Sequence, residues 1–157
     1  MEASKKTVNR GGALLATALV LVASLLAGAF AASAAATPPQ PVRFSSSIVV
    51  GPFTGTWSAS GAVNDAGTLT EPFVNFVGSG QLHIDRVLTG SSGTITIRIQ
   101  STLTRIDGNV ATFVGQWVVV SGSGSYANLH AGGERSATLD FTTGIVSETL
   151  TGDAHFD

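Results

Sequence analysis

Two different patterns of apolar and polar positions divide this chain of 157 residues. Residues 14–30 form an uncharged stretch rich in Leu, Val and Ala, whereas apolar and polar residues alternate with a period of two from Phe53 onward. Alternation of this kind is typical of β-strands with one buried face. The second part has no apolar stripe with helical spacing, so the sequence predicts an all-β domain behind an apolar leader.

Turn-forming residues separate the alternating segments. Clusters of Gly, Asn, Asp, Ser and Thr lie at residues 64–67, 91–93, 107–109 and 143–144. This spacing predicts seven or eight antiparallel strands joined by short turns, as in an up-and-down barrel or a sandwich. Because a closed sheet leaves no unpaired edge strand, we favour an eight-stranded barrel, with a β-sandwich as the alternative.

The alternation also predicts which side chains face the interior. The expected inward positions include Ile84, Ile97, Leu103, Leu139 and Phe141. Pro72 interrupts the alternating segment 68–77. Because proline lacks an N–H group, this position indicates an edge strand or a bulge.

Residues 1–34 have the organisation of a signal peptide. Three basic residues precede the apolar stretch, and the small residues 31–36 follow it. A positive start, an apolar middle and an A-x-A motif are typical of secretory signals, so we expect cleavage after Ala34, with Ala36 as the second candidate. An uncleaved membrane anchor is the alternative, because the apolar stretch is long enough to span a bilayer.

Cleavage would leave a short Pro-rich spacer, residues 35–42, and a β-barrel domain, residues 43–157, in a secreted, extracellular protein. The leader removes three of eight basic residues and one of ten acidic residues, which leaves five Arg against nine acids and a net charge of −4. That charge argues against binding of nucleic acid, and against a membrane partner once the leader is gone. The chain has no Cys, which excludes a disulfide framework and a thiol nucleophile.

The most distinctive segment of the domain runs from residue 117 to residue 133. Gly122 and Gly124 end a strand, and a short turn with Tyr126 and Leu129 leads to a second pair of glycines. Glycine allows positive φ at both ends of such a connection. Because Tyr126 and Leu129 are three residues apart, one helical turn would place both against the barrel end as a structural plug.

The pattern Gly-x-Gly-x-Tyr-Ala-x-Leu-x-x-Gly at residues 122–132, with residues 115–117 and 152–156, resembles a group of small exported bacterial proteins. These proteins are similar to the allene oxide cyclase and dirigent barrels. The resemblance implies an eight-stranded antiparallel barrel that forms homo-oligomers. It carries over no catalytic residue, because the carboxylate pocket of the cyclases and the acidic and Arg residues of the dirigent proteins have no residue-by-residue match here.

Three charged residues fall on strand faces that the alternation makes apolar: Arg86, Arg105 and Glu148. A buried carboxylate costs free energy unless it is paired, and burial raises its pKa. We therefore expect Glu148 and an Arg to form a polar spot inside the barrel, either as a ligand site or with Glu148 as a catalytic acid or base. The alternatives are a structural ion pair and a bulge that returns each residue to solvent.

Two Trp residues and three His residues complete the candidate chemistry. Trp57 and Trp117 lie among apolar neighbours, where they would form part of the core or line a pocket for a planar ligand. The His residues have neither H-x-H nor H-x-x-x-H spacing. We therefore expect no metal site, and nothing in the sequence indicates another cofactor.

Two functional hypotheses follow. The first is a non-catalytic exported barrel that binds a small apolar or aromatic ligand, or another surface component, through residues such as Arg86, Arg105, Glu148, Trp57 and Trp117. The second is a cyclase or isomerase of the allene oxide cyclase type, with Glu148 as the polarising carboxylate. A buried Glu148 that opens onto a cavity would favour the second hypothesis.

Overall fold

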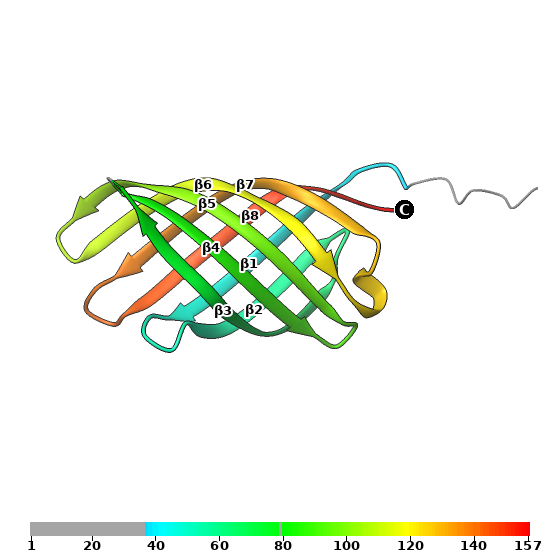
Figure 1. Cartoon of the computed structure of the whole chain (residues 1–157), viewed down its shortest axis with the longest axis horizontal. Helices are drawn as coiled ribbons and strands as arrows, with labels where there is room; N and C mark the ends of the chain where they lie inside the picture. The colour runs from blue at the N-terminus through cyan, green and yellow to red at the C-terminus, as the bar shows by residue number, and fades with distance from the viewer. Residues whose placement is uncertain (1–36, 79) are drawn as a thin grey trace, which may run out of the picture. The chain divides into compact units, whose positions relative to one another are not determined.

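The domain is a closed antiparallel barrel of eight strands (Figure 1), in the computed structural model that describes residues 37–78 and 80–157. The strands are β1 (Gln40–Val49), β2 (Thr54–Gly61), β3 (Asp65–Val77), β4 (Gln81–Gly90), β5 (Thr94–Asp107), β6 (Val110–Gly122), β7 (Leu129–Asp140) and β8 (Ile145–Phe156). Each strand pairs with its neighbours in sequence, and β8 pairs with β1. The predicted barrel is therefore confirmed, and the sandwich alternative is wrong.

The expected leader and its cleavage sites lie outside the described residues. Within the described part of the chain, no helix is long and apolar enough to cross a membrane. Strand β1 begins at Gln40, so the last three residues of the expected spacer, 40–42, already belong to the barrel.

The seam between β1 and β8 closes the barrel. Ten residue pairs join the two strands, from Gln40 opposite Ala154 to Val49 opposite Ile145. Thr37 extends this contact, because its N–H donates to the carbonyl oxygen of Phe156 at 2.9 Å. Two ends of the domain that are far apart in sequence thus lie side by side.

A bulge at Pro72 changes the inward face of β3 partway along the strand. Thr70 pairs with Val87 and Phe73 pairs with Asp85, so three steps along β3 match two along β4. Proline fits such a position because the extra residue leaves a gap in the ladder where no N–H is needed. This confirms the bulge that the sequence indicated, in a sheet that has no edge.

The two ends of the barrel differ. Four connections lie at one end, on the left in Figure 1, and we call this end the mouth. They include residues 50–53, Gly78 and Gly80, 108–109 and 141–144. The opposite end holds the remaining turns, the two ends of the domain and the short helix η1 (Gly124–Tyr126). Tyr126 and Leu129 are both buried there, which confirms the predicted plug.

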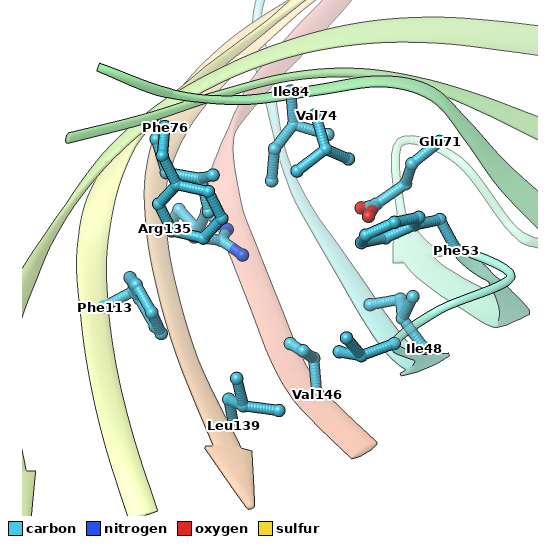
Figure 2. A pocket seen from close by; sticks show the side chains of 12 residues that line it. Ile48, Phe53, Glu71, Val74, Phe76, Ile84, Phe113, Arg135, Leu139 and Val146 are labelled. Carbon is cyan, nitrogen blue, oxygen red and sulfur yellow. The ribbon is translucent and has the colours of Figure 1, made fainter. Parts of the chain in front are cut away.

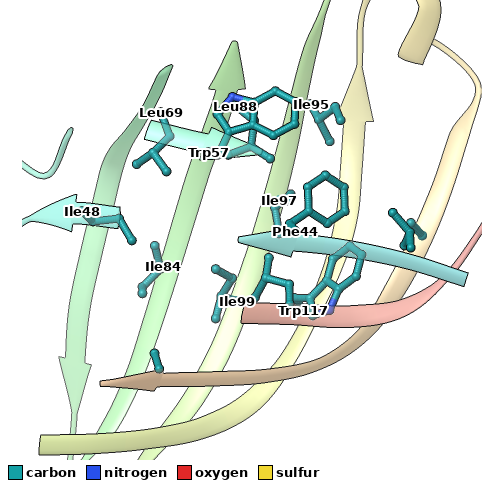
Figure 3. Close-up of a cluster of buried hydrophobic side chains, with 14 of the residues drawn as sticks. Phe44, Ile48, Trp57, Leu69, Ile84, Leu88, Ile95, Ile97, Ile99 and Trp117 are labelled. Atoms are coloured by element: carbon teal, nitrogen blue, oxygen red, sulfur yellow. The ribbon is translucent and has the colours of Figure 1, made fainter. Parts of the chain in front are cut away.

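Aromatic residues fill the half of the barrel opposite the mouth. The ring of Phe44 lies 6.0 Å from that of Trp57 and 5.4 Å from that of Trp117 (Figure 3). Burial of side chains of this size contributes about 1.5–3 kcal/mol each. Most predicted inward positions are confirmed, but Phe141 is wrong: it lies in the β7–β8 connection and is 55% exposed.

Candidate ligand-binding site

A cavity of about 100 Å³ opens at the mouth of the barrel (Figure 2), and we call it the mouth cavity. Its wall is almost entirely apolar and comes from six of the eight strands and the β1–β2 connection. The apolar side chains include Phe53, Phe76, Ile84, Phe113, Leu139 and Val146. Apolar cavities of similar size take up compact apolar molecules.

Phe53 is held over the mouth cavity in an unusual backbone conformation. Its φ is 51°, the left-handed region that a bulky non-glycine residue rarely adopts. The N–H of Glu71 donates to the carbonyl oxygen of Phe53 at 2.9 Å, and the Phe53 ring lies beside the Glu71 carboxylate (Figure 2). Strained residues that the surrounding structure holds in place are concentrated at functional sites.

Beyond the mouth cavity, a layer of ion pairs crosses the barrel interior. Glu148 Oε2 accepts a hydrogen bond from Arg135 Nε at 2.5 Å. Arg86 donates two hydrogen bonds to the same carboxylate, from Nη1 to Oε1 and from Nη2 to Oε2, the second at 3.2 Å. Glu71 Oε1 accepts from Arg86 Nε at 3.0 Å and from Nη2 at 2.5 Å. Arg135 Nη1 donates to Ser101 Oγ at 2.7 Å. We call these five residues the ion-pair layer.

The ion-pair layer is deeply buried and balanced in charge. The side chains of Arg86 and Glu148 are fully buried, and those of Arg135 and Glu71 are 2% and 6% exposed. Two guanidinium groups thus face two carboxylates. Buried charges are tolerated in proteins when they are paired and hydrogen-bonded in this way.

The charges within the layer decide the pKa of Glu148. Burial raises the pKa, but the positive charges of Arg86 and Arg135 and their hydrogen bonds outweigh it, so the pKa lies below its ordinary value. For Arg86, burial lowers the pKa, but the charges and hydrogen bonds of Glu148 and Glu71 raise it by more, so the net shift is upward and the guanidinium stays protonated. The raised pKa expected for Glu148 is therefore wrong, because that expectation counted burial without the two partners.

Within the described part of the chain, Glu71 and Arg135 are the charged residues that line the mouth cavity. Their side chains point into it from opposite sides (Figure 2). Glu148 and Arg86 lie beneath them and do not line this cavity. The cavity therefore has an apolar wall and two charged side chains that face each other, which we call the polar patch. An apolar wall with a few polar groups is the usual design of a small-molecule site.

Arg105 does not belong to this site, and its expected inward orientation is wrong. Leu103 pairs with Phe113, whereas Arg105 pairs with Thr112, so a bulge between them shifts the alternation of β5. Arg105 is consequently exposed and forms an ion pair with Asp107 at 2.5 Å, with both side chains about 70% exposed. Exposed pairs of this kind contribute little to stability.

Trp57 and Trp117 lie in the filled half of the barrel and not at the mouth cavity. Each is 3% exposed. Their indole N–H groups donate to the backbone carbonyl oxygens of Thr89 and Thr151, both at 3.2 Å. These contacts satisfy the polar end of each ring and make the two residues part of the core, which was the alternative to ligand stacking.

The His residues lie apart from the mouth cavity. The rings of His130 and His155 stack at 5.1 Å, and His130 Nε2 lies 2.9 Å from Asp157 Oδ2, all near the end of the domain opposite the mouth. Among the described residues, no group of three or more His, Cys, Asp or Glu is arranged to hold a metal ion.

Exposed apolar residues surround the mouth. Each of the four hairpins at this end carries at least one, for example Val50, Phe76, Ile106 and Phe141, which are 40–67% exposed. In the described part of the chain, the connections at the opposite end carry no large exposed apolar residue. Other exposed apolar residues lie on outer strand faces, such as Val118 and Val120 on β6. A group of exposed apolar residues around a cavity is typical of a binding site.

Three members of the ion-pair layer were not predicted from the sequence: Glu71, Ser101 and Arg135. The alternation along the strands does place two of them on inward faces. Ser101 lies on the same face as Ile99 and Leu103, and Arg135 lies on the same face as Ala137 and Leu139. Glu71 lies on the same face of β3 as Leu69, but the bulge that follows Glu71 interrupts the alternation of inward and outward residues.

Comparison with known proteins adds no relative. The chain matches no family model, no curated protein and no solved structure. The site is therefore interpreted from its own geometry.

Proposed function

We propose that this protein is a non-catalytic binding protein that takes a small apolar or aromatic molecule into the mouth cavity. The observation that carries the proposal is the cavity itself: an apolar wall, one polar patch made by Glu71 and Arg135, and an apolar rim. The ion-pair layer and the aromatic core fill the rest of the interior, so a ligand would be held at this end of the barrel.

The alternative is a cyclase or isomerase that uses Glu148, and the geometry supports it less. The Glu148 carboxylate is buried, but two arginines occupy it and it does not line the mouth cavity. Its lowered pKa disfavours the protonated form that a catalytic acid needs. The acidic side chain that meets the cavity is Glu71.

The wider setting of this function stays a prediction from the sequence. We propose that the leader directs export and that the barrel acts outside the cell, either released or still attached through an uncleaved leader. The similarity to the allene oxide cyclase and dirigent barrels, and the homo-oligomer that it implies, also remain predictions. The observed barrel agrees with that similarity in fold alone.

Filling the mouth cavity tests the proposal. Val146→Phe adds an aromatic ring to the cavity wall, and we expect it to weaken the binding of toluene about tenfold or more, because the added ring takes the space of the ligand. Toluene is a suitable probe because apolar cavities of similar size accept benzene. Binding is measured from chemical-shift changes in a nuclear magnetic resonance titration.

The matched control is Val118→Phe on the outer face of β6, where Val118 is 47% exposed. This variant should bind toluene as the unmodified protein does. If Val146→Phe binds toluene as tightly as the unmodified protein does, the mouth cavity is not the ligand site. Circular dichroism establishes that both variants retain the barrel.

A further inference from the structure

The polar patch of the mouth cavity has one unused donor and one unused acceptor. Arg135 uses Nε for Glu148 and Nη1 for Ser101, and Glu71 uses Oε1 for Arg86. Among the described residues, Arg135 Nη2 and Glu71 Oε2 have no hydrogen-bond partner. In this part of the chain, every fully buried side-chain nitrogen or oxygen has a hydrogen-bond partner. Because these two atoms have none, they are not fully buried and remain accessible to a ligand.

The balance of charge in the ion-pair layer restricts what the patch accepts. Two arginines and two glutamates already neutralise one another, as described above. A ligand with a charged head would add a fifth charge to a buried site with no partner left for it, which is costly in an apolar environment. An uncharged head that donates one hydrogen bond and accepts another fits the patch without that cost.

We propose that the ligand of the mouth cavity is a small neutral alcohol, whose hydroxyl donates to Glu71 Oε2 and accepts from Arg135 Nη2. A hydroxyl is a compact group that combines a donor with an acceptor. The body of the ligand is a single ring or a similarly compact apolar group, because the cavity is about 100 Å³ and Phe53, Phe76 and Phe113 line it. This inference rests on the proposed binding function and specifies its ligand class.

Three probes of nearly the same shape separate the possibilities: benzyl alcohol, toluene and benzoate. The unmodified protein should bind benzyl alcohol about five- to tenfold more tightly than toluene, which is the usual net effect of one good hydrogen bond. Benzoate should bind more weakly than benzyl alcohol, because its charge is uncompensated. Dissociation constants come from the same titration that tests the cavity.

Glu71→Gln sharpens the test because it removes one negative charge while keeping the size of the side chain. The ion-pair layer then has a net positive charge, so benzoate should bind more tightly than it does to the unmodified protein, and benzyl alcohol should lose part or all of its advantage. Glu134→Gln on the exposed face of β7 is the matched control and should leave the order of the three probes unchanged.

Glu71→Asp provides a second variant if Glu71→Gln does not fold. It keeps the charge but shortens the side chain by one methylene group, so benzyl alcohol should bind no better than toluene and benzoate should gain nothing.

The outcomes distinguish failure of the neutral-alcohol inference from failure of the proposed binding function. If toluene and benzyl alcohol bind equally, or if benzoate binds the unmodified protein most tightly, the neutral-alcohol inference is wrong while the binding function stands. If none of the three probes binds, the binding function itself fails. Unchanged affinities for benzyl alcohol and benzoate in a folded Glu71→Gln protein would also overturn the inference.

Discussion

Glu148 shows how a charged residue is accommodated inside this barrel. Its carboxylate has no contact with solvent, yet it accepts hydrogen bonds from two guanidinium groups. An isolated charge at this depth would be strongly unfavourable, and pairing offsets most of that cost. Removal of one member therefore leaves the others uncompensated, and stability should depend steeply on each of them.

Glu148→Gln should lower the free energy of unfolding by about 3–5 kcal/mol at neutral pH, because it leaves a buried positive charge without its partner. The loss should also depend on pH. The folded-state pKa of Glu148 lies below its ordinary value of 4.5, so its contribution is present above that pH and disappears as the pH falls through the folded-state value. The difference in stability between the two proteins should thus narrow below about pH 4.5. Urea denaturation at a series of pH values measures it.

Glu134→Gln is the control for this prediction, because Glu134 is an exposed glutamate on the strand that also carries Arg135. It should change the free energy of unfolding by no more than about 0.5 kcal/mol. A Glu148→Gln protein as stable as this control, or one whose difference from the unmodified protein does not change on acidification, would show that the ion-pair layer is not needed for stability.

At the scale of residues, the sequence predicted two of the five members of the ion-pair layer. Arg86 and Glu148 were identified because few charged residues occur in the domain and these two fall on apolar faces. The expected pairing of Glu148 with an Arg is confirmed, and the partner is Arg86. The pKa of Glu148 could not be predicted, because its direction depends on the distances to Arg86 and Arg135, which come from β4 and β7.

At the scale of secondary structure, bulges decide which side chains reach the interior. The bulge at Pro72 lets Glu71, before it, and Val74, after it, both line the mouth cavity. The bulge between Leu103 and Arg105 has the opposite effect, because it moves Arg105 into solvent. Proline made the first bulge visible in the sequence, whereas no residue type marked the second.

The short helix η1 is held in place by Asp65 at the start of β3. Asp65 Oδ2 accepts a hydrogen bond from the Tyr126 hydroxyl at 2.8 Å, and Oδ1 accepts from Ser91 Oγ, also at 2.8 Å. Hydrogen bonds from Ser91 and Tyr126 hold the pKa of Asp65 well below its ordinary value. One carboxylate therefore joins three connections at the end of the barrel opposite the mouth.

Tyr126→Phe removes the hydroxyl and keeps the buried ring. We expect the thermal unfolding midpoint to fall by about 2–6 °C, because one hydrogen bond to the carboxylate is lost. Hydrogen exchange should also become faster at the amide of Ser92, which donates to Asp65 Oδ2. Both effects should vanish when Tyr126→Phe is made in an Asp65→Ala background if the hydroxyl acts through the carboxylate. An undiminished effect there would contradict this assignment.

At the scale of the whole molecule, the barrel is a filled half joined to an open half. The ion-pair layer lies between the aromatic core and the mouth cavity. Arg86 and Glu148, deeper in the barrel, therefore hold Glu71 and Arg135 in position at the cavity. Among the strands of the described residues, only β1 and β8 are paired although distant in sequence; the other ladders join consecutive strands. Closure of that seam should therefore limit the stability of the barrel.

A disulfide across the seam tests this conclusion. Ser47 and Ser147 are paired and exposed, and the chain contains no other Cys. With Ser47→Cys and Ser147→Cys combined, oxidation should raise the free energy of unfolding by up to about 4–5 kcal/mol, since the bond closes a loop of about 100 residues. The measurement compares denaturation of the oxidised and reduced forms.

The matched control joins Thr56 and Thr68, an exposed pair in the β2–β3 hairpin. Their disulfide closes a short loop, so it should stabilise the protein by only about 3 kcal/mol or less. If the seam disulfide stabilises no more than the hairpin disulfide, closure between β1 and β8 does not limit stability.

The sequence by itself determined the all-β class, the antiparallel barrel, the plug at Tyr126 and the inward position of Arg86 and Glu148. These features follow from local patterns, because alternation and turn residues act over a few positions along the chain. The tertiary structure alone decided that Glu71 and Arg135 meet the cavity, that Arg105 does not, and that the two Trp residues fill the core. Those outcomes depend on the bulges and on the stagger between strands, which bring together residues that are far apart in sequence.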